Sequence, residues 1–168
     1  MRVLTPLLVL LGVACLLSAA EIPRDAARPA DKAPAADWDV IGKTIAPGQL
    51  KDDVYTVVLP RNDLDVHHLD LGLIPTAAGI EHRFHFFMCP CGKGSAVGTF
   101  AVADYELNDV IDELRKDNFK IVSTAPMFMG EKPRMMTLRF QGEGSAEEIA
   151  ATLKKALKWT GDNRNKVD

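Results

Sequence analysis

The sequence lacks the excess of basic residues that a nucleic-acid-binding protein needs. Lysines and arginines number 20 against 23 aspartates and glutamates, so the formal net charge of the 168 residues is −3 at pH 7. Surfaces that bind DNA or RNA depend on clustered positive charge, which neutralises the phosphates. We therefore expect no nucleic-acid partner.

Extreme composition is also missing. Hydrophobic residues make up 47% of the chain and charged residues 26%. This is the composition of a globular protein rather than of a collagen-like, coiled-coil or wholly disordered one. Because the chain is long enough for one hydrophobic core beside its terminal segments, we expect a single folded domain.

The apolar run at residues 7–17 is too short for a membrane span, because a hydrocarbon core of roughly 30 Å requires about 20 apolar residues of helix. A single basic residue precedes the run and small residues follow it at 18–20, the pattern of a signal peptide cleaved before Glu21. Residues 1–20 are therefore predicted to be a signal peptide. The mature protein is expected in the periplasm or outside the cell, with no membrane span; lipid attachment at Cys15 is the alternative.

Familiar catalytic patterns are absent from the sequence as well. Its serines lack the elbow and the His-Asp partners of a hydrolase, and the glycines around Lys93 lack the spacing of a phosphate-binding loop. Acidic residues such as Asp63 and Glu106 are expected to face solvent or to cap helices. These absences favour a binding module over an enzyme.

Composition and hydrophobic periodicity divide the chain after its leader into three parts. Residues 21–42 are rich in alanine and proline, which indicates a flexible tether. Residues 43–161 carry the patterns of regular structure, and residues 162–168 form a polar tail. A short amphipathic segment around Trp38 is expected to cover the domain.

Within the domain, alternating and aromatic runs predict strands, and 3.6-residue periodicity predicts helices. The predicted strands are residues 54–59, 66–74, 83–88, 95–103, 119–123 and 135–140. One predicted helix begins at a cap, Asp104, and ends at Asn118, while the other opens with the capping box of Ser145 and Glu148. We predict an α+β fold, a largely antiparallel sheet of about five to six strands with two helices packed on one face.

Several short motifs resemble the LppY/LpqO family, exported bacterial proteins whose domain has no agreed function. They are VYTVVLPRNDL at residues 54–64, IP at 74–75, ELNDV at 106–110 and GEKPR at 130–134. The family's members often contain two similar halves, whereas this chain has room for one, so the resemblance implies a single-copy form in which a homodimer could replace the missing half. Where the family typically carries His-Asn-His, this chain has Ala125-Pro126-Met127, so no activity of that histidine pair is implied.

The loop Met-Cys-Pro-Cys-Gly-Lys-Gly, residues 88–94, is the strongest candidate for chemistry. Two thiols one residue apart can converge on one ion, and thiolate with thioether ligands selects Cu(I) over hard cations. Zn(II) is the less favoured metal. The candidate ligands are Cys89 and Cys91, with Met127 or Met129 closing the shell and His82 able to supply an imidazole.

Two rival interpretations of this loop stay open. Removal of Cys15 with the leader leaves two cysteines in an oxidising compartment, where a structural disulfide between Cys89 and Cys91 would make the protein a non-metal binding or assembly module. A strained disulfide could instead exchange with thiols of other proteins. The thioredoxin-like Cys-x-x-Cys context is missing, so this redox interpretation has the least support.

Overall fold

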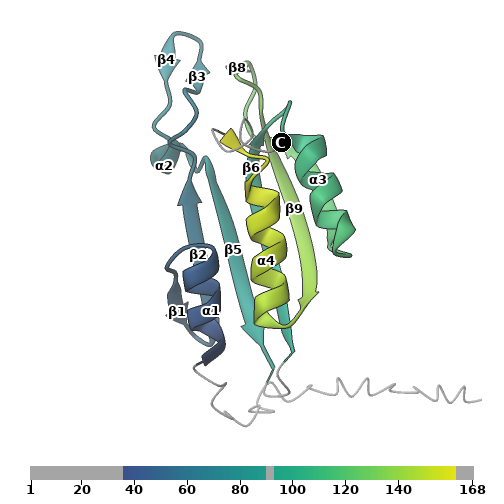
Figure 1. Cartoon of the computed structure of the whole chain (residues 1–168). Coiled ribbons are helices and arrows are strands. Elements are labelled where there is room, and N and C mark those ends of the chain that lie inside the picture. Colours follow the sequence, from purple (N-terminus) through teal and green to yellow (C-terminus); the bar gives the residue numbers. More distant parts are fainter. Residues whose placement is uncertain (1–35, 90–92, 162–168) are drawn as a thin grey trace, which may run out of the picture. The chain divides into compact units, whose positions relative to one another are not determined.

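The computed structural model describes residues 36–89 and 93–161 (Figure 1). The predicted signal peptide with Cys15, the tether up to residue 35, Cys91 and the polar tail lie outside these residues. The first described element, helix α1 (Ala36–Thr44), crosses the predicted boundary between tether and domain.

Every strand pair in the described part of the chain is antiparallel, in two sheets. The larger sheet has the order β1 (Gln49–Lys51), β2 (Val54–Pro60), β5 (Glu81–Met88), β6 (Gly94–Ala103), β9 (Met135–Gly144) and β7 (Lys120–Pro126). The smaller has the order β4 (Leu71–Gly72), β3 (His67–His68) and β8 (Glu131–Lys132). The remaining helices are α2 (Pro75–Ala78), α3 (Leu107–Lys116) and α4 (Ala146–Leu157).

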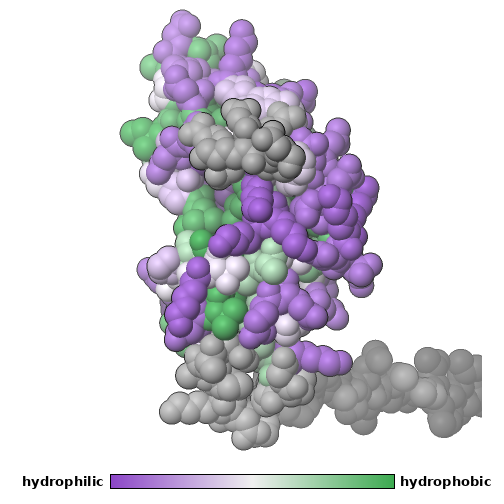
Figure 2. Space-filling model, in the orientation of Figure 1, coloured by the Kyte–Doolittle hydropathy of each residue, from purple (hydrophilic) through white to green (hydrophobic). Residues whose placement is uncertain are grey.

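Helices α1, α3 and α4 cover one face of the six-stranded sheet (Figure 1). Alternate side chains of each strand point to this face, so Phe84, Phe100 and Phe140 pack together beneath the buried Ile149 and Leu153 of α4. The predicted α+β fold is confirmed, with α1 as a third covering helix. Figure 2 shows hydrophilic side chains over α3, and none of the helices described is long and apolar enough to cross a bilayer.

The observed ends of the helices agree in part with those predicted from the sequence. Ser145 and Glu148 form the expected capping box of α4, and Asn118 adopts the left-handed conformation after α3. The start of α3 was predicted wrongly, because the helix begins at Leu107 with Glu106, not Asp104, at its N-cap position and no side-chain cap. The Glu106 carboxylate bonds elsewhere, as described below.

The prediction of one strand over residues 66–74 is wrong. Leu69 has a φ of 57°, which turns the chain back and leaves only the two-residue strands β3 and β4. This hairpin pairs with β8 and not with the large sheet, through His67 with Lys132 and His68 with Glu131.

The loop that contains this hairpin covers one end of the sheet's second face. Val66 and Ile80 of the loop pack on Ala101, Ala103 and Met135 in a second, smaller hydrophobic cluster. The alanines alternate along β6 with Phe100 and Val102 of the main core, so the two clusters lie on opposite faces. None of the described helices lies over the middle of this second face, which we call the uncovered face.

Candidate ligand-binding site

Cys89 follows β5 and closes the β5–β6 hairpin, since its backbone N–H donates to the carbonyl oxygen of Lys93 at 2.8 Å. Cys89 is disulfide-bonded. A thiol engaged in a disulfide is not available as a thiolate ligand.

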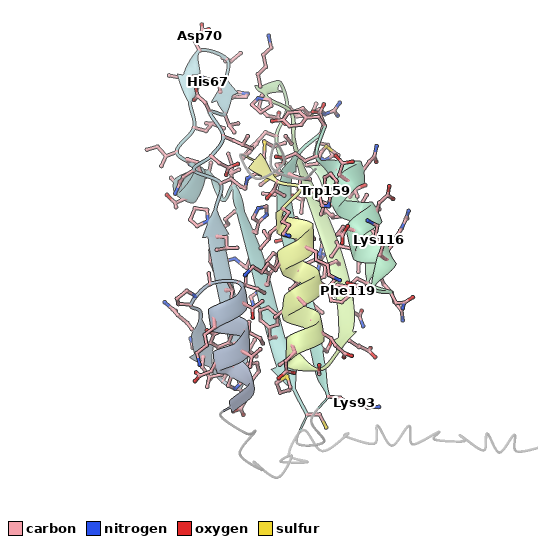
Figure 3. The ribbon with its side chains drawn as sticks, viewed as in Figure 1. His67, Asp70, Lys93, Lys116, Phe119 and Trp159 are labelled. Atoms are coloured by element: carbon pink, nitrogen blue, oxygen red, sulfur yellow. The ribbon has the colours of Figure 1, made fainter. Side chains whose placement is uncertain are left out.

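The predicted thioether ligands lie at the other end of the sheet. Cys89 is next to the first residue of β6, Gly94, whereas Met127 and Met129 belong to the β7–β9 connection, beside the last residue of β6, Ala103. A strand of 10 residues extends about 30 Å. In Figure 3, Lys93 is labelled at one end of the sheet and His67 at the other. His67 pairs with Lys132, which belongs to the β7–β9 connection. Within one chain, the fold therefore does not bring these sulfur atoms together; Met127 is half-buried and Met129 is 83% exposed.

His82 is not near Cys89 either, because it lies at the opposite end of β5. Its ring is buried between Phe84 and Phe100 at centroid distances of 6.2 and 5.2 Å, and its Nδ1 has no hydrogen-bond partner. Burial, with a smaller contribution from the positive charge of Arg61, lowers the pKa of His82 to about 3. Over the described residues, no three His, Cys, Asp or Glu side chains are grouped to hold a metal ion.

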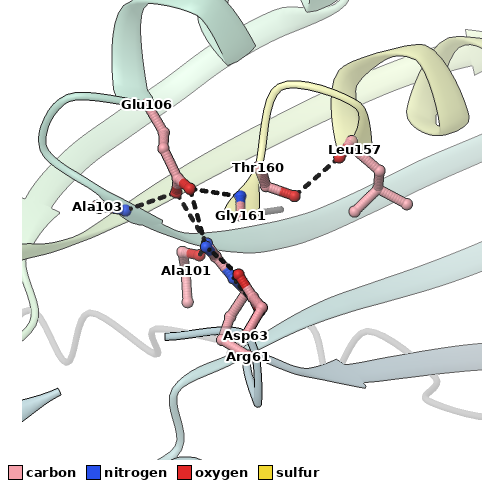
Figure 4. A network of polar contacts seen from close by, with 8 residues as sticks. All are labelled: Arg61, Asp63, Ala101, Ala103, Glu106, Leu157, Thr160 and Gly161. Atoms are coloured by element: carbon pink, nitrogen blue, oxygen red, sulfur yellow. Dashed lines mark hydrogen bonds and ion pairs between the residues drawn. The ribbon is translucent and has the colours of Figure 1, made fainter. Parts of the chain in front are cut away.

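A charge cluster of the buried Arg61 and Glu106 with the more exposed Asp63 was not foreseen (Figure 4). The side chains of Arg61 and Glu106 are 2% and 0% exposed and form two hydrogen bonds of 2.9 Å, where a capping or solvent-facing role was expected for Glu106. Arg61 also donates to Asp63 at 2.8 Å. Burial alone would raise the pKa of Asp63, but the hydrogen bond and charge of Arg61 outweigh it and hold that pKa below its usual value.

The remaining contacts of this charge cluster are to the backbone. Arg61 donates to the carbonyl oxygen of Ala101 at 2.7 Å, and Glu106 accepts from the N–H groups of Ala103 at 2.8 Å and Gly161 at 2.6 Å. With its hydrogen-bonding groups satisfied inside the protein, the cluster is a structural element that joins distant segments rather than a ligand site.

The uncovered face carries a groove of about 360 Å³. The residues that line it come from four strands of the large sheet. Strand pairing arranges them in two rows that run across the sheet. Arg83, Thr99 and Arg139 form one row, and His85, Val97 and Gln141 form the next, with Val122 of β7 at the side.

The charged groups of this groove are unequally paired. Arg83 is bonded to Glu81, with one contact of 3.1 Å from its Nε, whereas Arg139 makes no ion pair with any residue described. His85 shares a 3.0 Å hydrogen bond between its Nδ1 and the Thr56 hydroxyl. Partial burial, and then the charge of Arg83, lower the pKa of His85, so its ring is neutral at pH 7.

A second groove, of about 460 Å³, lies between α3 and α4. Most of its charged groups have partners within the protein: Asp117 accepts from Thr152 at 2.8 Å and from Lys155 at 2.9 Å, and Lys116 is paired with Glu113 at 2.7 Å. The groove on the uncovered face, with its unpaired guanidinium, is the better candidate for a ligand.

Together these features define a small antiparallel α+β domain with a groove on its uncovered sheet face. The sequence profile of the family described as Domain of Unknown Function (DUF1259) matches residues 39–159, and the chain belongs to that family. The description of this family does not mention LppY/LpqO, so the similarity to LppY/LpqO proteins stays a resemblance. No match was found among curated proteins or among solved structures.

Proposed function

We propose that the protein is an exported, non-metal binding module that holds its ligand in the groove of the uncovered sheet face. The observation that carries this proposal is the guanidinium of Arg139, which borders an open groove and has no partner among the residues described. The signal-peptide pattern of residues 1–20 supports export. The homodimer implied by the resemblance stays a prediction.

The lining of the groove favours binding over catalysis. Threonine, glutamine and arginine side chains project into it together with two valines, and its lining residues include no carboxylate, cysteine or serine. The single imidazole, that of His85, shares its Nδ1 hydrogen bond with the hydroxyl of Thr56, which is not among the residues that line the groove. An apolar surface with a few convergent polar groups is the usual arrangement of a small-molecule site.

Titration of the isotope-labelled chain with benzoate and, separately, with benzamide tests the groove. We expect at least one of these probes to shift the amide resonances of Val97, Thr99 and Gln141, because both have an aromatic body that fits a groove of this size. The variant Thr99→Trp, which fills the floor, should lose the shifts. Its matched control, Ala151→Trp, fills the groove between α3 and α4 and should keep them. Phenyl phosphate serves as a third probe. Shifts with none of the three probes, or shifts confined to the Ala151 groove, would contradict the proposal.

The rival hypothesis, copper binding by Cys89 and Cys91, can be tested on one sample. We expect no free thiol and no retained copper in the mature protein, because Cys89 is disulfide-bonded. A thiol count and a metal analysis provide the check. A copper site would instead give about one copper per chain after reducing purification, lost in Cys89→Ser, and the redox alternative would give turnover of a scrambled disulfide substrate.

A further inference from the structure

The two arginines of the groove face a common space. Arg83 and Arg139 lie on β5 and β9, in register with Thr99 on the strand between them. Adjacent strands are about 4.8 Å apart, so the two Cα atoms are separated by about 10 Å on the same face. At this spacing, both long side chains can reach one group placed above Thr99.

Positive charge exceeds negative charge around this space. Arg83, Arg139 and Lys120, which is in register with Gln141, are cationic, and Glu81 is the carboxylate paired with Arg83. The neutral His85 adds a polar ring without charge. A guanidinium presents parallel N–H donors that match the two oxygens of a carboxylate or a phosphate.

The groove also has an apolar part. Val97 and Val122 line it, and the side chain of Val122 is 58% exposed although it is hydrophobic. An apolar ligand body resting on these valines would remove their surface from water while its charged end meets the arginines.

On the basis of the proposed groove, we infer that its ligand is a small organic anion, with a carboxylate or phosphate group held between Arg139 and Arg83 and an apolar body on Val97 and Val122. Arg139 is the principal contact, since it gives up no existing ion pair when the anion binds, whereas Arg83 also bonds Glu81.

Titrations of the full chain with benzoate, phenyl phosphate and benzamide test this inference. We expect benzoate or phenyl phosphate to bind at least tenfold more tightly than neutral benzamide, because charge-assisted hydrogen bonds are roughly twice as strong as those between neutral groups. The tighter of the two anions identifies the preferred acid group. Arg139→Gln should weaken anion binding roughly tenfold or more and leave the melting temperature unchanged, since Arg139 is exposed. Arg115→Gln, an exposed arginine on α3, is the matched control and should bind as the original protein does.

The outcomes separate this inference from the proposed function. Binding of benzamide in the groove as tight as that of both anions, or unchanged anion binding in Arg139→Gln, would overturn the anionic ligand and leave the groove as a binding site. Absence of binding by all three probes would overturn both.

Discussion

Replacement of Arg61 by alanine should lower the free energy of unfolding by about 3–5 kcal/mol. Glu106 is 0% exposed and receives two of its hydrogen bonds from Arg61. The substitution would leave this carboxylate buried without its counter-charge, which is among the most destabilising changes that a single substitution can make. Urea denaturation followed by circular dichroism measures the change.

A double variant and an exposed control sharpen this test. Arg61→Met combined with Glu106→Leu removes both charges and should recover much of the lost stability, because no ion is left unpaired. Lys43→Ala removes one member of the exposed Lys43–Asp39 pair, whose side chains are 81% and 76% exposed, and should change stability little. If Arg61→Ala lowered the free energy of unfolding as little as Lys43→Ala does, the structural role assigned to the cluster would be refuted.

The second large effect is a loss of stability in acid that begins near pH 6.5. The pKa of His82 is about 3 in the folded protein against 6.5 for an ordinary histidine. Between these values the unfolded chain binds a proton that the folded chain does not, so stability falls as pH falls. The loss should be about 2 kcal/mol at pH 5 and on the order of 5 kcal/mol at pH 3.

His82→Leu isolates this contribution. Leucine has no ring nitrogen to leave without a partner, as Nδ1 is now, so the variant should be at least as stable at pH 7. Between pH 6.5 and 4 its stability should fall much less than that of the original protein, with only the lowered pKa of the partly buried His85 still contributing among the histidines. Below that, the lowered pKa of Asp63 acts in the same direction, because the stability from its ionised form is lost as the carboxylate is protonated. Denaturation midpoints at several pH values provide the measurement, and parallel curves for the two proteins would refute the assignment.

Local signals in the sequence predicted much of the fold. Strand alternation alone puts residues three apart, such as His82 and His85, on opposite faces of a sheet, and the structure has one ring in the core and the other in the groove. The capping box at Ser145 was correct because its contacts lie within four residues of one another. Such features depend on neighbours in the chain and need no knowledge of the tertiary arrangement.

The missed features depend on which distant segments meet. Arg61 and Glu106 are separated by 45 positions, and neither residue shows from its own surroundings that it will be buried with the other. The proposed ligand set failed to assemble within one chain for the same reason, because loop composition does not indicate at which end of the sheet Cys89 or Met129 will lie. The groove was likewise invisible, since its two rows of residues exist only after strand pairing.

The carboxylate of Glu106 links three segments of the domain that are distant in the sequence. It accepts bonds from Arg61 near one end of the described chain, from Ala103 in the middle and from Gly161 at the other end. If any one of these segments detaches, the buried carboxylate of Glu106 loses a hydrogen-bond partner. The early loop, the end of β6 and the turn after α4 are therefore constrained to open as one cooperative unit, which keeps the sheet beneath the groove rigid.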